Sequence, residues 1–374
     1  MVYKNWKKGL LFIALVSSLS TNIFGKEPLI IEEQGSFAAG GVVLKNSGVF
    51  DSKKANDSTP FKLYPPEGQT FHGDHAYVFY QKPVDMKKYP IVFLHGGGQS
   101  GKSWETTPDG REGFQNIFLR KKYGVYIVDQ PRRGRAGQGT VPMQINPSNS
   151  DQYLYNFFRI GLYPEFFDGV QFPKDEESFN QYYRQVTPNT GAFDEEIVAK
   201  AMSAVFDKTG EGILVAHSQG GGAAMSAAMK NKNVKALVLY EPGGCSLFFP
   251  EGAEIGIPKE ELPDYFSVNM VSKKEFKKLT EIPIIIYFGD NIPSEKSEYP
   301  ILEEWRLRLN LARKWAEIVN ANGGDAKIVH LPEIGVKGNT HFPFSDLNNE
   351  EIADLMEKWL EEKGLNKEES IPVY

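Results

Sequence analysis

The chain alternates between short apolar runs and longer segments with helical spacing. Short runs rich in Val, Ile and Leu favour strands that are buried on both faces of a sheet. Between them, residues 193–208, 298–321 and 350–361 place apolar side chains along one face of a helix. We therefore expect an α/β protein, with a mostly parallel central sheet of about eight strands and helices on both faces. The expected strands lie at residues 40–45, 75–80, 91–94, 124–129, 213–216, 234–240, 282–288 and 325–331.

Two segments interrupt this alternation. Residues 141–190 are dense in aromatic side chains and fall where the next strand and helix would otherwise follow. We expect an inserted cap there, whose rings line an apolar or aromatic pocket, hold the cap to the body, or do both. Residues 245–281 are rich in Lys and Glu, and we expect them to form a polar surface excursion.

The first 25 residues have the pattern of a secretory signal peptide. Three lysines precede an apolar run from Leu10 to Val16, and small polar residues follow. The run is too short to span a membrane comfortably. We expect residues 1–25 to be removed, which leaves 26–374 as one secreted or periplasmic domain without a stable membrane span.

The acidic balance and the single cysteine narrow the classes of protein. The net charge is −6 and becomes −9 without residues 1–25, so nucleic acid is not an expected partner. Cys245 stands alone, so no disulfide is expected within the chain. No Cys/His cluster has metal-ligand spacing, and neither a metal nor an organic cofactor is expected.

The run at 213–216 leads into His217-Ser218-Gln219-Gly220 and then into a helical segment of small residues. A serine flanked by small residues at this junction is typical of a nucleophile elbow, which exposes the hydroxyl at the carboxyl edge of the sheet. The usual pattern is G-x-S-x-G, and Ala216 replaces its first glycine. This fits because the position demands a small residue. The alternative is that Ser218 only caps the following helix.

A glycine-rich turn follows the expected strand at 91–94. His95 precedes Gly96, Gly97 and Gly98, whose backbone N–H groups can approach a ligand closely. An oxyanion hole needs such preformed donors, aimed at charge that develops in a transition state. We expect the N–H of Gly97, or alternatively of Gly98, to act with the N–H of Gln219.

The same turn also satisfies a phosphate-binding pattern. Residues 96–103 read G-G-G-Q-S-G-K-S, which matches the P-loop, and they follow a strand as a phosphate cradle does. This interpretation is disfavoured because a secreted protein meets little nucleoside triphosphate. It also leaves Ser218 and His341 without a role.

Three arginines follow the expected strand at 124–129, at the same edge of the sheet. They are Arg132, Arg133 and Arg135. We expect them to pair with acids such as Asp129, with binding of an anionic substrate as the alternative.

A nucleophilic serine needs a base, and the base needs an acid that orients it. His341, in a loop after the last expected strand, is the candidate base, because the chain order serine, acid, histidine suits such a sheet. Glu241 and Asp290 each end an expected strand and can serve as the acid. Strand position alone favours Asp290.

The other histidines near these motifs are not expected to act as the base. The His217 side chain should point away from the adjacent serine. His95 is expected to support the glycine turn, and His330, within a strand, to be structural.

Together the motifs resemble the α/β-hydrolase superfamily. Within it, they are similar to secreted or periplasmic bacterial serine esterases that carry the triad glutamate in an E-P-G turn and the histidine in a G-N-[ST]-H loop. The resemblance implies Glu241, rather than Asp290, as the acid. Better-known members of that group carry two cysteines where this chain has Gly97 and Gly98. The motifs are HGGG at 95–98, AHSQGG at 216–221, LYEPGG at 239–244, YFGD at 287–290 and GNTH at 338–341.

These expectations combine into a secreted serine hydrolase that cleaves a carboxylic ester through an acyl-enzyme. The expected partner is a small-molecule ester with an apolar or aromatic part, and the sequence is compatible with an oligomer. Two alternatives stay open. One is an amidase or peptidase that uses the same triad, and the other is a catalytically inactive hydrolase fold used for binding.

Overall fold

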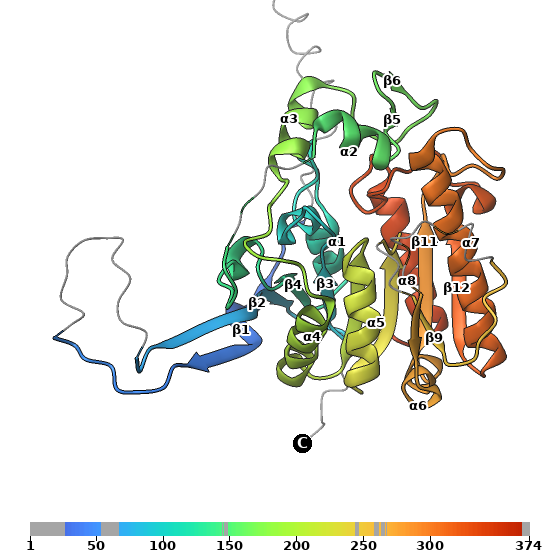
Figure 1. The fold of residues 1–374 in the computed structure, drawn as a ribbon. Helices are drawn as coiled ribbons and strands as arrows, with labels where there is room; N and C mark the ends of the chain where they lie inside the picture. The colour runs from blue at the N-terminus through green and yellow to red at the C-terminus, as the bar shows by residue number, and fades with distance from the viewer. Residues whose placement is uncertain are drawn as a thin grey trace, which may run out of the picture. The chain divides into compact units, whose positions relative to one another are not determined.

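Eight strands form one sheet, which confirms the α/β prediction (Figure 1). β1 pairs antiparallel with β2, and β2 pairs antiparallel with β4. All the other neighbours in the sheet are parallel. In sheet order the strands are β1 (Ile31–Lys45), β2 (Thr70–Pro83), β4 (Val125–Asp129), β3 (Ile91–Leu94), β7 (Gly212–His217), β8 (Val234–Tyr240), β11 (Pro283–Phe288) and β12 (Asp325–His330).

This is a computed structural model, and it describes most of the chain. The described residues are 27–53, 67–143, 145, 149–243, 247–257, 262, 266 and 268–368. The segment predicted to be a signal peptide, 1–25, and Cys245 lie outside them. From Ile31 onward the described residues belong to one structural unit.

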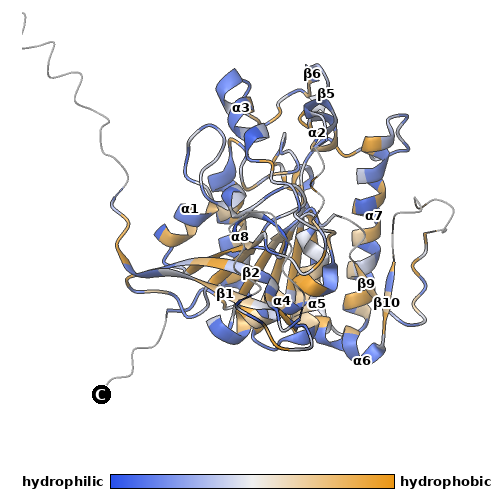
Figure 2. Ribbon diagram, turned by 60° about the vertical axis from the view of Figure 1, so that its left-hand side comes forward, coloured by the Kyte–Doolittle hydropathy of each residue, from blue (hydrophilic) through white to orange (hydrophobic). Residues whose placement is uncertain are grey.

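Helices cover both faces of the sheet, because successive side chains of a buried strand point to opposite layers. Leu94 joins the core formed with α4, α5 and α7, whereas the adjacent Phe93 packs against Phe114 and Phe118 of α1, which contacts α8. Figure 2 shows hydrophobic residues concentrated along the central strands. The helices are α1 (Phe114–Arg120), α4 (Glu195–Thr209), α5 (Gly220–Lys230), α7 (Pro300–Ala321) and α8 (Asn349–Glu362).

The segment predicted as a cap folds into short elements between β4 and α4. Ser150 and Asp175 cap its two helices by accepting hydrogen bonds from Tyr153 N–H and Ser178 N–H. The ring of Phe158 stacks on His341 at a centroid distance of 5.2 Å, so the segment reaches the carboxyl edge of the sheet. Its elements are α2 (Asp151–Phe157), β5 (Gly161–Leu162), β6 (Glu165–Phe166) and α3 (Glu176–Arg184).

Three expectations from the sequence were wrong in detail. β2 spans Thr70–Pro83 rather than residues 75–80. β1 begins at Ile31 rather than at residue 40, because it is an edge strand whose largely exposed positions carry no apolar pattern. The segment 245–281 is not only surface. Its aromatic residues Phe249 and Phe276 are buried, and the carbonyl of Phe248 accepts a hydrogen bond from Trp315 Nε1 at 2.8 Å. Scattered apolar residues hold this segment on α7 although Lys and Glu dominate its composition. It contains β9 (Phe248–Pro250), β10 (Asn269–Val271), α6 (Lys273–Phe276) and η4 (Lys277–Thr280).

Candidate active site

Ser218 lies on a tight turn between β7 and α5. Its φ of 49° is in the left-handed region, and its N–H donates to the carbonyl of Tyr240 at 3.0 Å. The glycines after it allow close crossing: a Cβ at Gly220 would lie 2.7 Å from the carbonyl oxygen of His95, and one at Gly221 would lie 2.6 Å from Pro242. A strained serine that only small neighbours permit is the local geometry of a nucleophile elbow.

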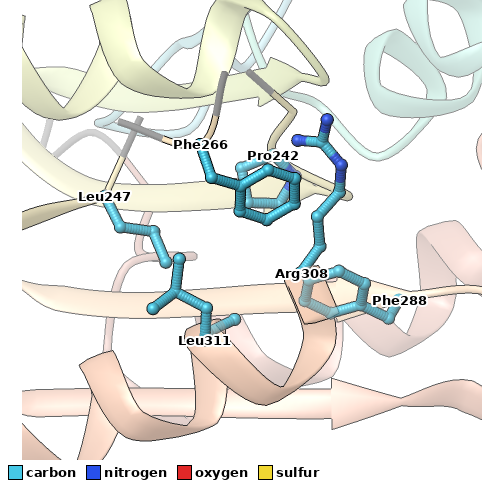
Figure 3. A pocket seen from close by; sticks show the side chains of 7 residues that line it. Pro242, Leu247, Phe266, Phe288, Arg308 and Leu311 are labelled. Atoms are coloured by element: carbon cyan, nitrogen blue, oxygen red, sulfur yellow. The ribbon is translucent and has the colours of Figure 1, made fainter. Parts of the chain in front are cut away.

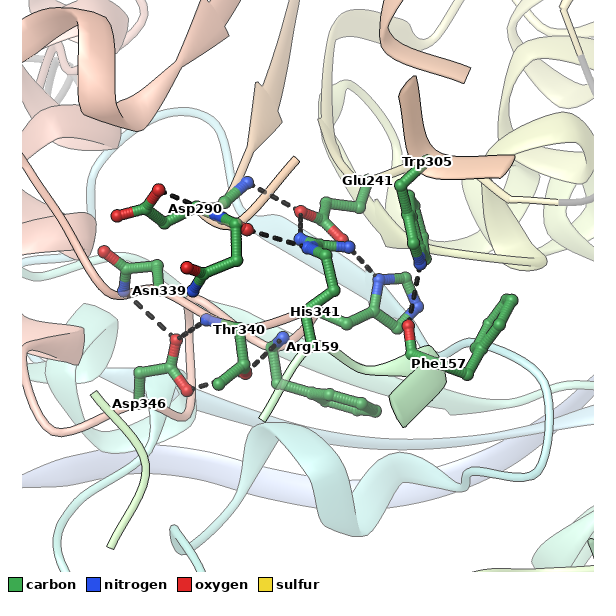
Figure 4. A network of polar contacts seen from close by, with 12 residues as sticks. Phe157, Arg159, Glu241, Asp290, Trp305, Asn339, Thr340, His341 and Asp346 are labelled. Carbon is green, nitrogen blue, oxygen red and sulfur yellow. Dashed lines mark hydrogen bonds and ion pairs between the residues drawn. The ribbon is translucent and has the colours of Figure 1, made fainter. Parts of the chain in front are cut away.

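His341 is fully buried in the loop that follows β12, and its two ring nitrogens have different surroundings. Its Nδ1–H donates to Glu241 Oε2 at 2.5 Å (Figure 4). Its Nε2 is buried and has no hydrogen-bond partner among the described residues. The imidazole is thus fixed by Glu241 with the other nitrogen left as an acceptor. Burial lowers the pKa of His341 below its usual value, and the Arg159 charge acts in the same direction.

Glu241 follows β8 with a φ of 45° and is also fully buried. While Oε2 faces His341, Oε1 accepts hydrogen bonds from the Gly289 N–H at 2.6 Å and from Arg159 Nη2. Burial alone would raise the pKa of the Glu241 carboxyl. The Arg159 guanidinium and the His341 ring outweigh burial and hold that pKa below its usual value, so Glu241 is a carboxylate.

Asp290, the alternative acid, has a different set of partners. Its Oδ1 accepts from the Asn291 N–H at 2.6 Å, and its Oδ2 accepts from the Gly338 N–H at 2.7 Å. It therefore braces the start of the loop that carries His341. The structure brings Glu241, rather than Asp290, to the imidazole, as the resemblance implies and strand position alone does not.

Further contacts fix the backbone on either side of His341. The buried carboxyl of Asp346 accepts from both the N–H and the hydroxyl of Thr340, at 2.7 and 2.8 Å, and from Asn339 Nδ2 at 3.1 Å. Burial raises the pKa of Asp346 to about 7. The His217 ring lies against the His341 ring, with centroids 4.4 Å apart, and its Nε2–H donates to the carbonyl of His341 at 2.9 Å.

The glycine turn after β3 lies beside the elbow. The N–H groups of Gly97, Gly98 and Gln219 donate to no other group in the described part of the chain, so all three are free for a ligand. Arg133 braces this region by donating to the Gly96 carbonyl at 2.8 Å and to Gln219 Oε1 at 3.3 Å. That Gly97 and Gln219 form an oxyanion hole stays a prediction.

His95 holds the same glycine turn through hydrogen bonds of its ring. Its Nδ1–H donates to the Gly96 carbonyl at 2.9 Å, and its Nε2 accepts from the Gln130 N–H at 3.2 Å. Burial lowers the pKa of His95 to about 4, so the ring is neutral at physiological pH.

In the P-loop-like stretch, a carboxylate occupies the amide of the second glycine of the pattern, Gly101. The Gly101 N–H donates to Asp129 Oδ1 at 2.6 Å, and the ammonium of Lys102 donates to the Thr106 carbonyl at 2.5 Å. A buried carboxylate beside the turn would repel a phosphate group. This geometry argues against nucleotide binding.

The three arginines after β4 are held by the protein. Arg132 pairs with Asp74 at 2.7 Å, and Arg135 pairs with Asp129 at 2.7 Å. Arg133 donates to Asn189 Oδ1 at 2.6 Å as well as to the glycine turn, and burial lowers its pKa to about 10. Two of the three thus form the acid pairs that the sequence predicts.

Sequence reasoning missed Arg159, which is fully buried and bonded to Glu241. From its position in the sequence, the residue belongs only to the aromatic segment 141–190. The available signal was a single cation between Phe158 and Ile160, within a run of aromatic and aliphatic residues. Such a cation is costly to bury unless it has a partner.

An apolar pocket lies beyond the turn that carries Glu241 (Figure 3). Its lining includes Phe288, the last residue of β11, and Pro242, which lies two residues after the end of β8. Among the described lining residues, the one charged side chain is that of Arg308, from α7. The cavity has a volume of about 10 Å³, which is room for about one water molecule. The other lining residues are Leu247, Phe266, Leu311 and Ala312.

The described residues offer neither a metal-binding cluster nor a membrane-spanning helix. They contain no group of three or more His, Cys, Asp or Glu side chains placed to bind a metal ion. Over the same residues, every helix is too short or too polar to span a bilayer.

Comparisons with known proteins identify the family of the chain. A model of the alpha/beta hydrolase family matches residues 91–314. The "Probable secreted lipase phiG" of Fungal sp. (strain ATCC 74256) is 29% identical over 314 residues, which cover 74% of this chain and 82% of the relative. A solved structure described as "The Atomic Resolution Structure of a Novel Bacterial Esterase" is 30% identical, with a TM-score of 0.71, over 90% of this chain and 98% of its own. Since the family model spans more than half of its length, the chain belongs to the alpha/beta hydrolase family.

Proposed function

We propose that the protein is a serine hydrolase that cleaves carboxylic esters through an acyl-enzyme. One observation carries the proposal: the imidazole of His341 is held by a buried carboxylate at one nitrogen and has no partner among the described residues at the other. Ser218 directly follows His217, whose ring lies 4.4 Å from the His341 ring. Catalytic hydrogen bonds to serine are often long in ligand-free enzymes and tighten in the substrate complex.

The proposed first half-reaction forms the acyl-enzyme. Ser218 Oγ attacks the ester carbonyl carbon while His341 Nε2 takes the serine proton, and Glu241 stabilises the resulting imidazolium. The N–H groups of Gly97, with Gly98 as the alternative, and of Gln219 donate to the oxyanion. The intermediate collapses, the C–O bond to the alcohol breaks, and His341 returns the proton to the leaving oxygen.

The second half-reaction reverses these roles with water. His341 Nε2 takes a proton from water, the hydroxide attacks the acyl carbon, and the bond to Ser218 Oγ breaks. The serine regains its proton from the imidazolium, and the carboxylic acid leaves. The residues named here supply each proton transfer, so the scheme involves neither a metal nor an organic cofactor.

The proposed substrate is a small-molecule ester with an apolar or aromatic part. Aromatic side chains surround the imidazole: Phe158 stacks on it at 5.2 Å, and Trp305 lies at 4.6 Å. The names of the two relatives, an esterase and a secreted lipase, support an ester substrate. The lipase name and residues 1–25 together support secretion or export to the periplasm.

A fluorophosphonate probe tests the proposal on the mature protein. We expect wild type to be labelled and to hydrolyse p-nitrophenyl esters, and Ser218→Ala to lose both. Ser36→Ala, an exposed serine on β1, is the matched control and should behave as wild type. A folded wild-type protein with neither labelling nor ester turnover would overturn the proposal. Labelling with turnover of p-nitroanilides alone would assign amide hydrolysis instead.

A further inference from the structure

The cap is bonded directly to the catalytic apparatus by three successive residues. Trp305 Nε1 donates to the Phe157 carbonyl at 2.7 Å, and the His341 N–H donates to the Phe158 carbonyl at 2.9 Å. The third residue, Arg159, reaches Glu241 (Figure 4). A φ of 57° at Arg159 turns the chain here, away from the helical path of α2.

The guanidinium of Arg159 is held on several sides. Its Nε donates to the carbonyl of Asp290 at 2.8 Å, and its Nη2 donates to Glu241 Oε1. Its Cζ lies 4.4 Å from the centroid of the Trp305 ring. The side chain is fully buried, as is that of Glu241. An ion pair buried away from solvent keeps both partners charged and in one geometry, because burying either charge alone would be costly.

We propose that Arg159 is a positioning residue that fixes Glu241 against His341, so that the cap, as well as the sheet, holds the catalytic acid. The inference rests on the proposed function. It also assigns the cap a role beyond covering a pocket, because the cap supplies the counter-charge of the triad.

The arrangement sets the direction of a pH effect. The His341 Nδ1–H donates to the Glu241 carboxylate at 2.5 Å, and the fixed cation beside them disfavours a second proton on the imidazole, at Nε2. The other titratable or charged groups around the pair are Arg308 of α7, His217 of β7 and Asp346 of the histidine loop. These remain when Arg159 is removed, so the change in proton affinity reports Arg159 alone.

Arg159→Met should raise the pH at which the imidazolium of His341 loses its Nε2 proton. We expect the acid limb of kcat/KM for a p-nitrophenyl ester to move upward by about 1 pH unit, and kcat to fall about 10- to 100-fold. Arg159→Lys keeps the positive charge but lacks the planar guanidinium. The acid limb of its kcat/KM profile should therefore stay near that of wild type. Arg184→Met, an exposed arginine on α3 of the cap, is the matched control.

A second measurement makes the test independent of ester turnover. The downfield proton resonance of His341 Nδ1–H, assigned by its loss in His341→Gln, reports the pair in wild type and in each Arg159 variant. We expect it to titrate about 1 pH unit higher in Arg159→Met. An unchanged titration in folded Arg159→Met would overturn the inference, whatever the activity. If Arg159→Met does not fold, an Arg159→Lys titration shifted as far as 1 pH unit would overturn it instead. Failure of probe labelling at Ser218, with a shifted resonance, would overturn the proposed function and leave the positioning role intact.

Discussion

Glu241→Gln and Asp290→Asn form a matched pair that separates the two candidate acids. The two carboxylates follow the neighbouring strands β8 and β11, and each change replaces one oxygen by an amide nitrogen. In Glu241→Gln, the position of Oε1 faces two donors, the Gly289 N–H and Arg159 Nη2. The amide oxygen must occupy it, and the amide nitrogen therefore faces His341 Nδ1.

This forced amide orientation sets the magnitude. An amide N–H that points at Nδ1 makes it an acceptor and moves the ring proton to Nε2, where it blocks acceptance of the serine proton. The imidazolium also loses its charged partner. Two unit charges whose centres lie about 4 Å apart attract by about 4 kcal/mol at an effective dielectric constant of about 20. The combined expectation is a fall in kcat of about 10³-fold or more.

Asp290→Asn should behave differently. It removes one of two acceptors for the Asn291 and Gly338 N–H groups, which destabilises the folded protein by about 1–3 kcal/mol. Because His341 is untouched, kcat should fall less than about 10-fold. The assay is p-nitrophenyl ester hydrolysis, with active sites counted by fluorophosphonate labelling and folding checked by thermal melts. Equal losses in the two folded variants, or a larger loss in Asp290→Asn, would refute the reasoning.

Two further predictions concern the serine turn and the histidine loop. A Cβ at Gly243 would lie 2.9 Å from Ser218 Oγ. Gly243→Ala should therefore displace this hydroxyl and lower kcat/KM for the p-nitrophenyl ester by about 10²-fold. A wild-type kcat/KM in this variant would contradict the close contact. Burial raises the pKa of Asp346 to about 7, so the folded state binds this proton more tightly than the unfolded chain does. The contribution of Asp346 to the free energy of unfolding is therefore complete below about pH 4 and is lost as the pH rises through about 7. Urea unfolding at several pH values should show this decline in wild type and a flatter dependence in Asp346→Asn, whereas identical slopes would exclude a proton on Asp346.

Local patterns were sufficient where a feature depends on one contiguous stretch. The buried strands β7 and β8 read as continuous apolar runs, and α4 and α7 as helical spacing within two residues of their observed starts. The elbow at Ser218 was readable because small residues must surround a tight strand-to-helix crossing. Patterns were insufficient where burial is selective. The edge strand β1 shows mostly polar residues, and Phe249 is buried within a segment of polar composition.

The sequence by itself determined the fold class and singled out Ser218 and His341 as candidates, because strand burial, turn chemistry and chain order leave local marks. Only the tertiary structure brought Glu241 to His341 and set the Asp290 carboxylate against Gly338, in the loop that leads to His341. Both acids follow parallel strands at one edge of the sheet, and local pattern does not distinguish them. Tertiary structure also decided the place of Arg159. Its partner lies 82 residues away, and a buried charge becomes favourable only when the fold supplies the opposite charge at contact distance.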